Sequence, residues 1–394
     1  MKSRKISEVG EVVRGVTFDK SESIDSALDG YIPILRAGNI TESGLKLEND
    51  IMWVPQSRIS DNQMLKQNDV VICMASGSAK VLGKNAQLKQ TWKGSVGAFC
   101  AIVRFSNGIN SQFGAYWLKS SEFIHWRDSQ EKGANIQNLR KSSLEELEIP
   151  IPSLPEQERI VRLLDEAESL RATRERANVR MEQFAPALFH EMFGDPVRNE
   201  KKWDKKVLME FGAVVRYGLG QPPTISEEGI PMLRATNIKH GKISTDGLIY
   251  VHREDVPSGR NAFLEADEIL VVRSGAYTGD IARVGEEWKG AVAGYDLVVN
   301  PGDMFNGEFL ASYLLTNFVQ KEYFSSMKQR AAQPHINAQQ VGNTPVFCPP
   351  LALQREFAAR VEEARGVQSA QGKSAGRVEA LYQSMLARAF AGEL

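Results

Sequence analysis

The sequence predicts an α+β protein with an internal tandem duplication, in which two similar globular domains are separated by two long helices that form an antiparallel coiled coil. Three observations predict this class. Ordered segments of the first half recur in the second half. Each half begins with roughly 150 residues of short apolar runs broken by turn residues. Each half then ends in a long stretch with helical periodicity.

The repeat is visible as matched segments in the same order. Ile32–Ile40 matches Ile230–Ile238, and Asp69–Gly77 matches Asp267–Gly275, both at an offset of 198 residues. Six such matches keep offsets between 196 and 202 residues. One of them aligns Arg14 with Arg216. A period of this length indicates two domains of one fold and not a solenoid.

Within each globular part, apolar runs predict buried strands. In the first half they are Val70–Met74 and Ala98–Val103, and in the second they are residues 269–272 and 297–299. Apolar residues at helical spacing predict one helix in each half, at 112–120 and at 308–319.

The first long helix is predicted over residues 155–193, which contain no glycine. Pro155 suits the first helical turn, and Gly194 followed by Pro196 ends the pattern. The apolar residues fall three, four and seven apart and form one stripe. At about 1.5 Å per residue, the helix spans about 58 Å. Pro186 is a possible kink.

The second long helix is predicted over residues 352–390. Gly366, Gly372 and Gly376 weaken its middle, each by about 1 kcal/mol relative to alanine. The helix therefore needs a partner, and its twin is the obvious one. This reasoning predicts the antiparallel pair.

Composition narrows the class of protein. Hydrophobic residues make up 42% and charged residues 25%, which is typical of a globular chain. The three cysteines form no CxxC pair, which argues against a zinc ribbon and for a reducing compartment. We expect neither a signal peptide nor a membrane span, and thus a cytoplasmic protein. The net charge of −1 is unusual for a DNA-binding protein that acts alone.

Catalytic motifs fail on inspection. Gly77–Asn85 resembles a phosphate-binding loop, but the glycine spacing is wrong and Asn85 replaces the Ser or Thr that would hold magnesium. His190–Glu191 lacks the second histidine of a zinc motif. No Asn/Asp-Pro-Pro-Tyr/Phe run of an amino-methyltransferase is present. We therefore expect no catalytic residues and no metal site.

Two pairs of segments carry a family resemblance. The first is Ile149–Ile160, a proline-rich entry to the long helix that includes Gln157, and Pro349–Phe357 with Gln354 is its second copy. The second is the C-terminal Leu386–Leu394, joined by a mid-chain Met192–Pro196. This ordered set resembles the specificity (S) subunit of type I restriction-modification enzymes over essentially the whole chain.

The resemblance implies a division into four parts. Residues 1–152 and 195–350 would be target-recognition domains, and residues 153–194 and 351–394 would be helical spacers. Each domain would read one half of a bipartite, asymmetric DNA site. The chain itself would hold no cofactor and catalyse nothing. Its partners would be two methyltransferase (M) subunits with S-adenosylmethionine and restriction (R) subunits with ATP and Mg. Those subunits could share the neutralisation of DNA phosphates.

Candidate DNA-binding residues follow from side-chain chemistry, since arginine pairs with guanine and asparagine with adenine. Arg36, Asn39, Arg234 and Asn237 fit this code, although their presence in both halves equally favours a structural role. Arg273 has no basic equivalent in the first half, because Ala75 is aligned with it. The remaining candidates lie in glycine loops after buried strands or in two polar loops: Ser76, Gly77, Ser78, Lys80, Lys132, Asn135, Gln137, Ser274, Tyr277, Lys328, Arg330, Gln333, His335 and Asn337.

The resemblance further suggests partner-binding residues on the two helices: Gln157, Ile160, Leu164, Gln354, Phe357 and Phe390. Two other functions stay open from the sequence. One is a self-contained methyltransferase or nuclease component with a bipartite target, and the other is an assembly scaffold that does not contact DNA.

Overall fold

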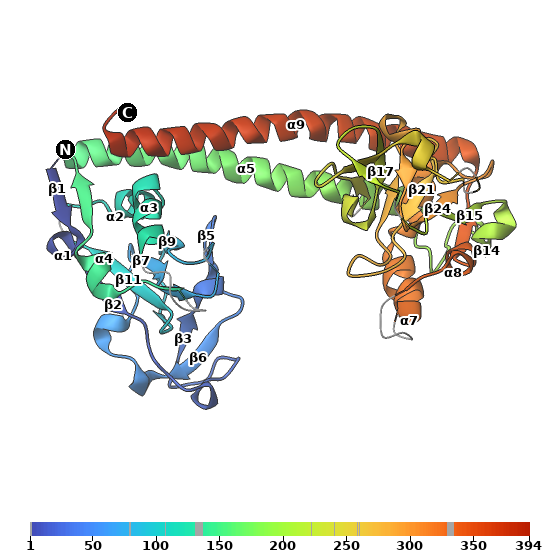
Figure 1. Cartoon of the computed structure of the whole chain (residues 1–394). Coiled ribbons are helices and arrows are strands. Elements are labelled where there is room, and N and C mark those ends of the chain that lie inside the picture. Colours follow the sequence, from blue (N-terminus) through green and yellow to red (C-terminus); the bar gives the residue numbers. More distant parts are fainter. Residues whose placement is uncertain are drawn as a thin grey trace. The chain divides into compact units, whose positions relative to one another are not determined.

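The computed structural model (Figure 1) describes residues 2–394 except 79, 107, 131–136, 222, 240, 258, 260 and 329–334; the side chains of residues 137, 327, 328 and 373 are also left out. The chain forms two compact units, one from Met1–Arg176 with Gly372–Leu394 and the other from Ala177–Gln371. Each unit therefore contains a globular part and one segment of each long helix. No helix in the described part of the chain is both long and apolar enough to cross a membrane.

The first unit is built on an antiparallel sheet in the order β2 (Gly10–Arg14), β11 (Cys100–Phe105), β7 (Val70–Cys73), β9 (Asn85–Gln87). A second sheet has the order β10 (Ser95–Val96), β3 (Tyr31–Leu35), β6 (Met52–Pro55). Three strand pairs complete it: β1 (Lys2–Lys5) with β13 (Glu148–Ile151), β4 (Ile40–Thr41) with β5 (Gly44–Leu45), and β8 (Ala75–Ser76) with β12 (Gln137–Asn138). The short helices are α1 (Ile6–Val9), α2 (Ser111–Trp117), α3 (Ser121–Ser129) and α4 (Lys141–Glu145).

The second unit repeats this plan. Its main sheet has the order β15 (Val214–Tyr217), β24 (Leu297–Asn300), β21 (Ile269–Val271), β22 (Ile281–Arg283). The other sheet has the order β16 (Ile225–Ser226), β20 (Ile249–Val251), β17 (Ile230–Leu233), β23 (Val292–Ala293), and two pairs join β14 (Asp204–Val207) to β25 (Pro345–Cys348) and β18 (Ile238–Lys239) to β19 (Lys242–Ile243). The helices are α6 (Gly307–Leu314), a π-helical segment over Phe318–Phe324, α7 (Ser325–Lys328) and α8 (Ala338–Gly342).

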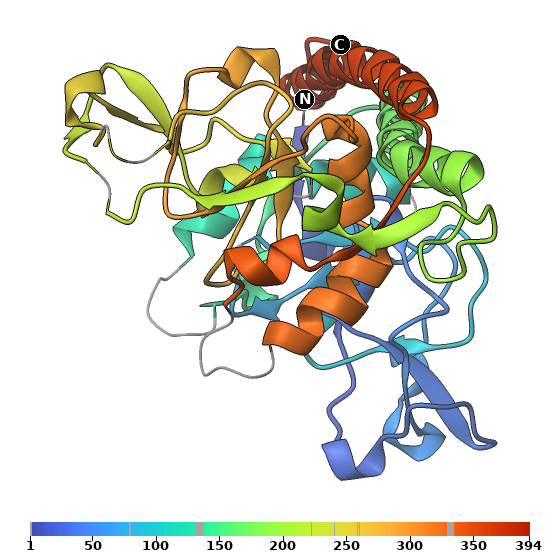
Figure 2. The same cartoon turned by 90° about the vertical axis from the view of Figure 1, so that its right-hand side faces the viewer.

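The two long helices are α5 (Leu154–Phe193) and α9 (Leu351–Ala391), close to the predicted bounds. Helix α5 continues through Pro186, and α9 continues through its three glycines. Figure 1 shows α5 and α9 as unbroken helices, and the turned view of Figure 2 looks nearly along them. The α+β class with two similar domains and long helices is thereby confirmed.

The helix segments run antiparallel within the first unit. Arg159 near the start of α5 donates to the backbone of Leu394, whereas Arg171, three turns later, binds Glu379 at 2.6 Å. The Arg171 guanidinium also lies 4.4 Å from the ring centre of Tyr382. Advancing along α5 therefore means going back along α9. A cation over an aromatic face and an ion pair together fix this register.

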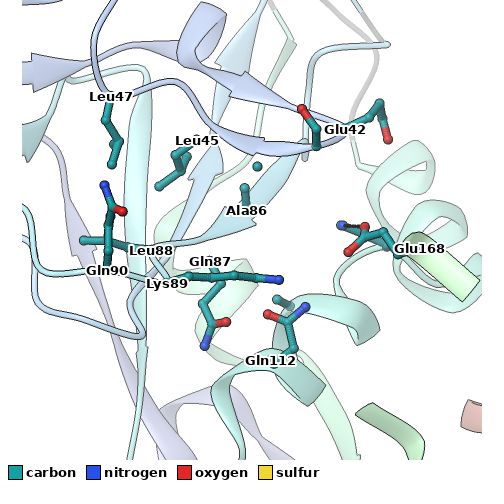
Figure 3. A pocket seen from close by; sticks show the side chains of 14 residues that line it. Glu42, Leu45, Leu47, Ala86, Gln87, Leu88, Lys89, Gln90, Gln112 and Glu168 are labelled. Carbon is teal, nitrogen blue, oxygen red and sulfur yellow. Dashed lines mark hydrogen bonds and ion pairs between the residues drawn. The ribbon is translucent and has the colours of Figure 1, made fainter. Parts of the chain in front are cut away.

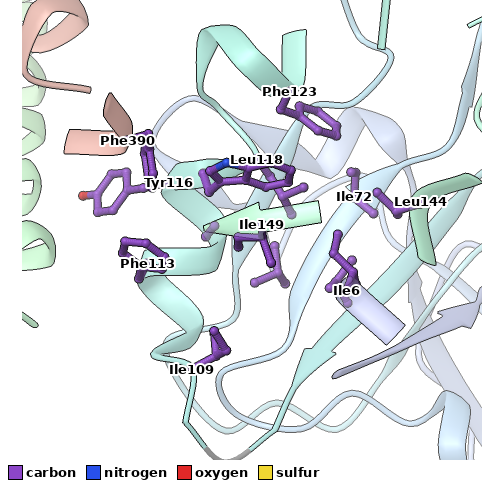
Figure 4. Packing of buried hydrophobic residues seen from close by; sticks show 14 of the residues in the cluster. Ile6, Ile72, Ile109, Phe113, Tyr116, Leu118, Phe123, Leu144, Ile149 and Phe390 are labelled. Atoms are coloured by element: carbon purple, nitrogen blue, oxygen red, sulfur yellow. The ribbon is translucent and has the colours of Figure 1, made fainter. Parts of the chain in front are cut away.

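The α9 segment of the first unit completes the core of the globular part. Phe390 packs against Phe113 of α2 with ring centres 5.3 Å apart (Figure 4). The buried Tyr116 of the same helix donates to Asp165 of α5 at 2.7 Å. The α2 helix thus contacts both long helices.

In the second unit, aromatic rings join the same parts. Phe189 and Phe193 of α5, Phe357 of α9 and Phe309 of α6 lie with ring centres 4.7 to 5.8 Å apart. Each such pair contributes about 0.5–1.5 kcal/mol beyond the area it buries. These contacts hold the two helix segments to the globular part.

Two glutamines make the same clamp in the two units. Gln157 accepts a hydrogen bond from the backbone N–H of Asn110 at 2.8 Å and donates to the carbonyls of Gly108 and Pro152, each at 3.0 Å. Gln354 is bonded in the same way to Asn306, Met304 and Pro349. Both side chains are fully buried. Each clamp ties the first turn of a long helix to the loop before α2 or α6.

Gln157→Ala is expected to destabilise the first unit, and Gln354→Ala the second, by about 2–4 kcal/mol each, because three backbone groups lose their hydrogen bonds to a buried side-chain amide. Denaturant titration followed by hydrogen exchange of each unit would measure this loss. Gln383→Ala, on an exposed face of α9, is the control and should leave both units unchanged. Equal stability of Gln157→Ala and the wild type would remove the clamp from the account.

Candidate nucleic-acid interface

The first pair of predicted base readers forms a turn after β3. Asn39 is buried, and its Oδ1 accepts the backbone N–H of Arg36 at 2.8 Å. Its Nδ2 donates to the carbonyls of Lys46 and Asn49 at 3.3 and 2.8 Å. The side chain thus closes the loop and has no atom left for a base.

Asn237 repeats this arrangement after β17. It accepts from the backbone of Arg234 at 3.2 Å and donates to the carbonyls of Ser244 and Asp246 at 3.1 and 3.0 Å. The prediction that Asn39 and Asn237 read DNA is therefore corrected, because burial and backbone bonding make both of them structural. The guanidinium groups of Arg36 and Arg234 are only partly used within the loop, since the Nη2 of each donates to one carbonyl of the same loop.

Arg273 lies in a cluster of aromatic side chains at the end of β21. Its guanidinium carbon is 4.2 Å from the ring centre of Tyr295 and 4.9 Å from that of Tyr217. One Nη lies 3.3 Å from Nε2 of His335. Both tyrosines are more than two-fifths exposed. The cluster thus holds the cation of Arg273 between two aromatic faces.

The cluster borders an open pocket of the second unit, lined by Tyr217, Gly220, Asn261 and Arg273 together with Arg216. This combination of groups is chemically suited to nucleic acid, because guanidinium groups bind phosphates or guanine edges and aromatic rings contact bases. Restricted rotation of the stacked Arg273 lowers the entropy lost on binding.

The buried carboxyl group of Asp296 is hydrogen-bonded to the backbone of Arg273. Its Oδ1 accepts the backbone N–H of Arg273 at 3.3 Å, while its Oδ2 is buried without a partner among the described residues. Burial raises the pKa of Asp296 to about 6, although the hydrogen bond from the Arg273 backbone and the charge of Arg273 both lower it. The second unit therefore has a buried carboxyl group with a raised pKa next to the partly exposed Arg273.

This raised pKa predicts a pH-dependent stability. Because the folded state holds the proton more tightly than the unfolded state, the stabilisation is present below about pH 4 and is lost as the pH rises through about 6. Asp296→Asn keeps an oxygen for the backbone bond and removes the charge. The variant is expected to be more stable than the wild type at pH 8, by about 1–3 kcal/mol. Thermal unfolding of the variant and the wild type at pH 5 and pH 8 would measure this. An equal difference in stability between the two proteins at both pH values would contradict it.

Arg216 does not belong to the exposed cluster. It forms a two-point ion pair with the buried Glu268 and donates to the carbonyls of Asn261 and Phe263 at 2.8 and 3.0 Å. In the first unit Arg104 makes the matching pair with the buried Asp69, at 2.8 and 2.7 Å. These arginines anchor the sheet.

The hydrogen bonds revise the predicted alignment of the two halves. Gly15 donates to the carbonyl of Cys100, and Gly218 donates to the carbonyl of Asp296, so these glycines are equivalent. A Cβ on either would meet the carbonyl of Gly97 or Gly294 at 2.1 or 2.2 Å. The equivalent of Arg14 is therefore Tyr217, and the predicted pairing of Arg14 with Arg216 is wrong by one residue.

The alignment of β7 with β21 is also shifted by one residue. Cys73 exchanges backbone hydrogen bonds with Lys84 and Gly83. Val272 exchanges the equivalent bonds with Asp280 and Gly279. Met74, which is buried, is thus the equivalent of Arg273, in place of the predicted Ala75. Arg273 still has no basic equivalent at its own position.

The other predicted DNA-binding residues fall into three groups. Gly77, Ser78, Lys80 and Tyr277 are exposed, and Ser76 and Ser274 are half-buried. Asn337 caps α8 by accepting the N–H of Gln340 at 2.8 Å. Lys132, Asn135, Arg330 and Gln333 lie outside the described residues, as do the side chains of Gln137 and Lys328.

The predicted partner-binding residues lie inside the chain's own cores. Ile160, Leu164, Phe357 and Phe390 are buried, and Gln157 and Gln354 are the clamps described above. Their contacts are within the chain, which corrects the prediction that they contact a partner. The apolar stripe alone did not distinguish the side facing the domain from an outer side.

A smaller pocket in the first unit, of about 230 Å³, lies beside α5 (Figure 3). Glu42, Gln87, Gln112 and the ion pair between Lys119 and Glu168, 3.0 Å long, line it. No residue predicted to bind DNA lines this pocket. Among the described residues, no group of three His, Cys, Asp or Glu side chains could hold a metal ion.

Comparisons with known proteins agree with this architecture. Residues 1–180 match the family model of the type I restriction modification DNA specificity domain. The EcoKI specificity subunit of Escherichia coli K12 is 30% identical over 99% of this chain and 88% of its own length. The StySPI specificity subunit of Salmonella potsdam is 29% identical over the same shares of both chains.

Solved structures show the same fold. The S subunit of a type I restriction-modification system from M. genitalium has a TM-score of 0.59, with 18% identity over 99% of this chain and 96% of that one. A chain from a study of complex assembly and conformational transition of the type I R-M system has a TM-score of 0.58, with 16% identity over 100% and 98%. Two similar α+β domains with two long helices thus define the fold class that this chain shares with these structures. This chain belongs to the family of type I restriction enzyme specificity subunits.

Proposed function

We propose that this chain confers DNA sequence specificity on a cytoplasmic type I restriction-modification complex. Each unit reads one half of a bipartite, asymmetric site in double-stranded DNA, and the paired helices set the distance between the halves. The chain catalyses nothing itself. Methyltransferase subunits with S-adenosylmethionine and restriction subunits with ATP and Mg supply the chemistry.

The observation that carries this proposal is the arginine held between Tyr217 and Tyr295. Among the described residues, Arg273 is the cation of this cluster, and it belongs to the side chains that differ between the two units. In contrast, the clamps of Gln157 and Gln354 have the same bonds in both. Shared scaffolds with different exposed side chains are expected of two domains that read different sequences.

The net charge of −1 fits shared binding. A protein with no basic excess gains little from phosphate contacts alone. Methyltransferase subunits that enclose the duplex would supply the missing neutralisation. Binding by the isolated chain should accordingly be weak and become strong in the assembled complex.

The test is a methyl-transfer assay with labelled S-adenosylmethionine and DNA. The chain with its methyltransferase subunits should transfer methyl groups to specific sites, and the chain alone should transfer none. Transfer by the chain alone would establish the alternative of a self-contained methyltransferase. Transfer by the methyltransferase subunits to the same sites without this chain would leave it as a scaffold.

A further inference from the structure

The revised alignment identifies four equivalent positions around the aromatic cluster. In the second unit they hold Tyr217, Arg273, Tyr295 and His335. Arg14 of the first unit is equivalent to Tyr217, Met74 to Arg273, and Phe99 to Tyr295. These equivalences follow from the backbone hydrogen bonds of Gly15, of Cys73 and of the loops after Gly97 and Gly294.

The fourth position follows from the strand that crosses this end of the sheet. The N–H of Leu139 donates to Met74, and the N–H of Ile336 donates to Arg273. The residues just before them, Asn138 and His335, are therefore equivalent. Asn138 pairs with Ala75 in β12 and β8, as His335 pairs with Ser274.

None of the four positions has the same residue in both units, but their composition is related. Each unit supplies one arginine and at least one exposed aromatic ring, Phe99 being 63% exposed in the first unit. The arginine comes from β2 in the first unit and from the end of β21 in the second. Arg14 is exposed, and its side chain makes no ion pair or hydrogen bond with the described residues. Asn138 is exposed as well.

We propose that Arg14 and Asn138, beside Phe99, form the base-reading site of the first unit and bind the major-groove edges of purines in the first half-site. This inference rests on the proposed function of the chain. Arginine binds guanine O6 and N7, and asparagine binds adenine N6 and N7. Both side chains are exposed, and unlike Asn39 neither has a hydrogen-bond partner among the residues that the structure describes. Both lie where the second unit places different residues.

The experiment uses the chain assembled with its methyltransferase subunits, on the cognate duplex and on duplexes with single substitutions in either half-site. Arg14→Ala is expected to weaken binding about 5- to 150-fold and to abolish discrimination at one position of the first half-site. Asn138→Ala should act likewise at a second position of the same half. Discrimination within the second half-site should not change.

Two further variants keep the outcome interpretable. Arg4→Ala removes an exposed arginine of the same unit, on a strand outside the main sheet, and should bind as the wild type does. Arg14→Lys keeps the charge but loses the two-point geometry, so it should stay unable to discriminate. A uniform loss that Arg14→Lys restores would assign Arg14 to phosphate and overturn base reading.

Unchanged binding and discrimination in Arg14→Ala and Asn138→Ala would also overturn the inference, provided that the wild-type complex reads a bipartite site. A wild-type complex that recognises no bipartite site would instead overturn the proposed function. The two failures are thus distinguished by the wild type alone.

Discussion

Arg273→Ala, in the assembled complex, is expected to bind the cognate duplex about 1–3 kcal/mol more weakly and to lose discrimination at one position of the second half-site. The guanidinium is held between Tyr217 and Tyr295, and among the described residues its Nη groups have one hydrogen-bond contact, with His335. Its Nε is buried, so the Nη groups are the donors that would reach a guanine edge. Because the residue is partly exposed and anchored by its backbone, the variant should fold normally.

Binding titrations at two salt concentrations separate the possible contacts. A base contact changes the preference at one position, whereas a phosphate contact lowers affinity evenly and flattens the salt slope by about one. Unchanged affinity on every duplex would remove Arg273 from the interface. The loop over residues 328–337 would then be the better candidate.

Arg216→Ala is the matched control. It leaves the buried Glu268 without its ion pair, which costs about 3–5 kcal/mol of stability. Its effect should therefore appear in the unfolding of the second unit and not in base preference. A change of sequence preference in folded Arg216→Ala would contradict the division between anchoring and reading arginines.

The second large effect concerns the helices. Four residues inserted after Arg174 of α5, with four after Ser374 of α9, add about 6 Å and keep each apolar stripe nearly in phase. The gap between half-sites is expected to lengthen by about one or two base pairs, while both half-sites stay the same. Sequencing of methylated sites would show the new gap.

A control insertion of four residues after Asp29, in an exposed loop, should leave the gap unchanged. Altered half-site bases with an unaltered gap in the helix variant would contradict the spacing role. The helix insertion tests the pair as a spacer, and the loop insertion shows that added length alone has no effect.

Large regular features could be predicted from the sequence. The glycine-free stretch and its stripe predicted α5 almost to the residue, and the repeated segments predicted two domains of one fold. The turn closed by Asn39 could be foreseen as one of two alternatives, because asparagine in both halves suits a structural role. Only the hydrogen bonds decided between them.

The remaining features depended on strand register and on packing, which matching residues along the sequence does not reveal. The extra residue at Tyr217 shifts the strand by one, and in a strand one residue reverses the face of every side chain. Matching Arg14 to Arg216 by letter therefore hid the exposed position of Arg14. The partner residues failed for another reason, since an apolar stripe does not reveal whether it packs on its own domain, as Phe357 and Phe390 do.

The most direct test of the account is the map of N6-methyladenine in cells that contain this chain and its methyltransferase subunits. Two units with one scaffold and different residues at the four reading positions predict a methylated motif in two different parts, separated by a fixed gap of unspecified bases. Arg14→Ala should relax one part and Arg273→Ala the other. A palindromic motif, or a single continuous one, would contradict the account.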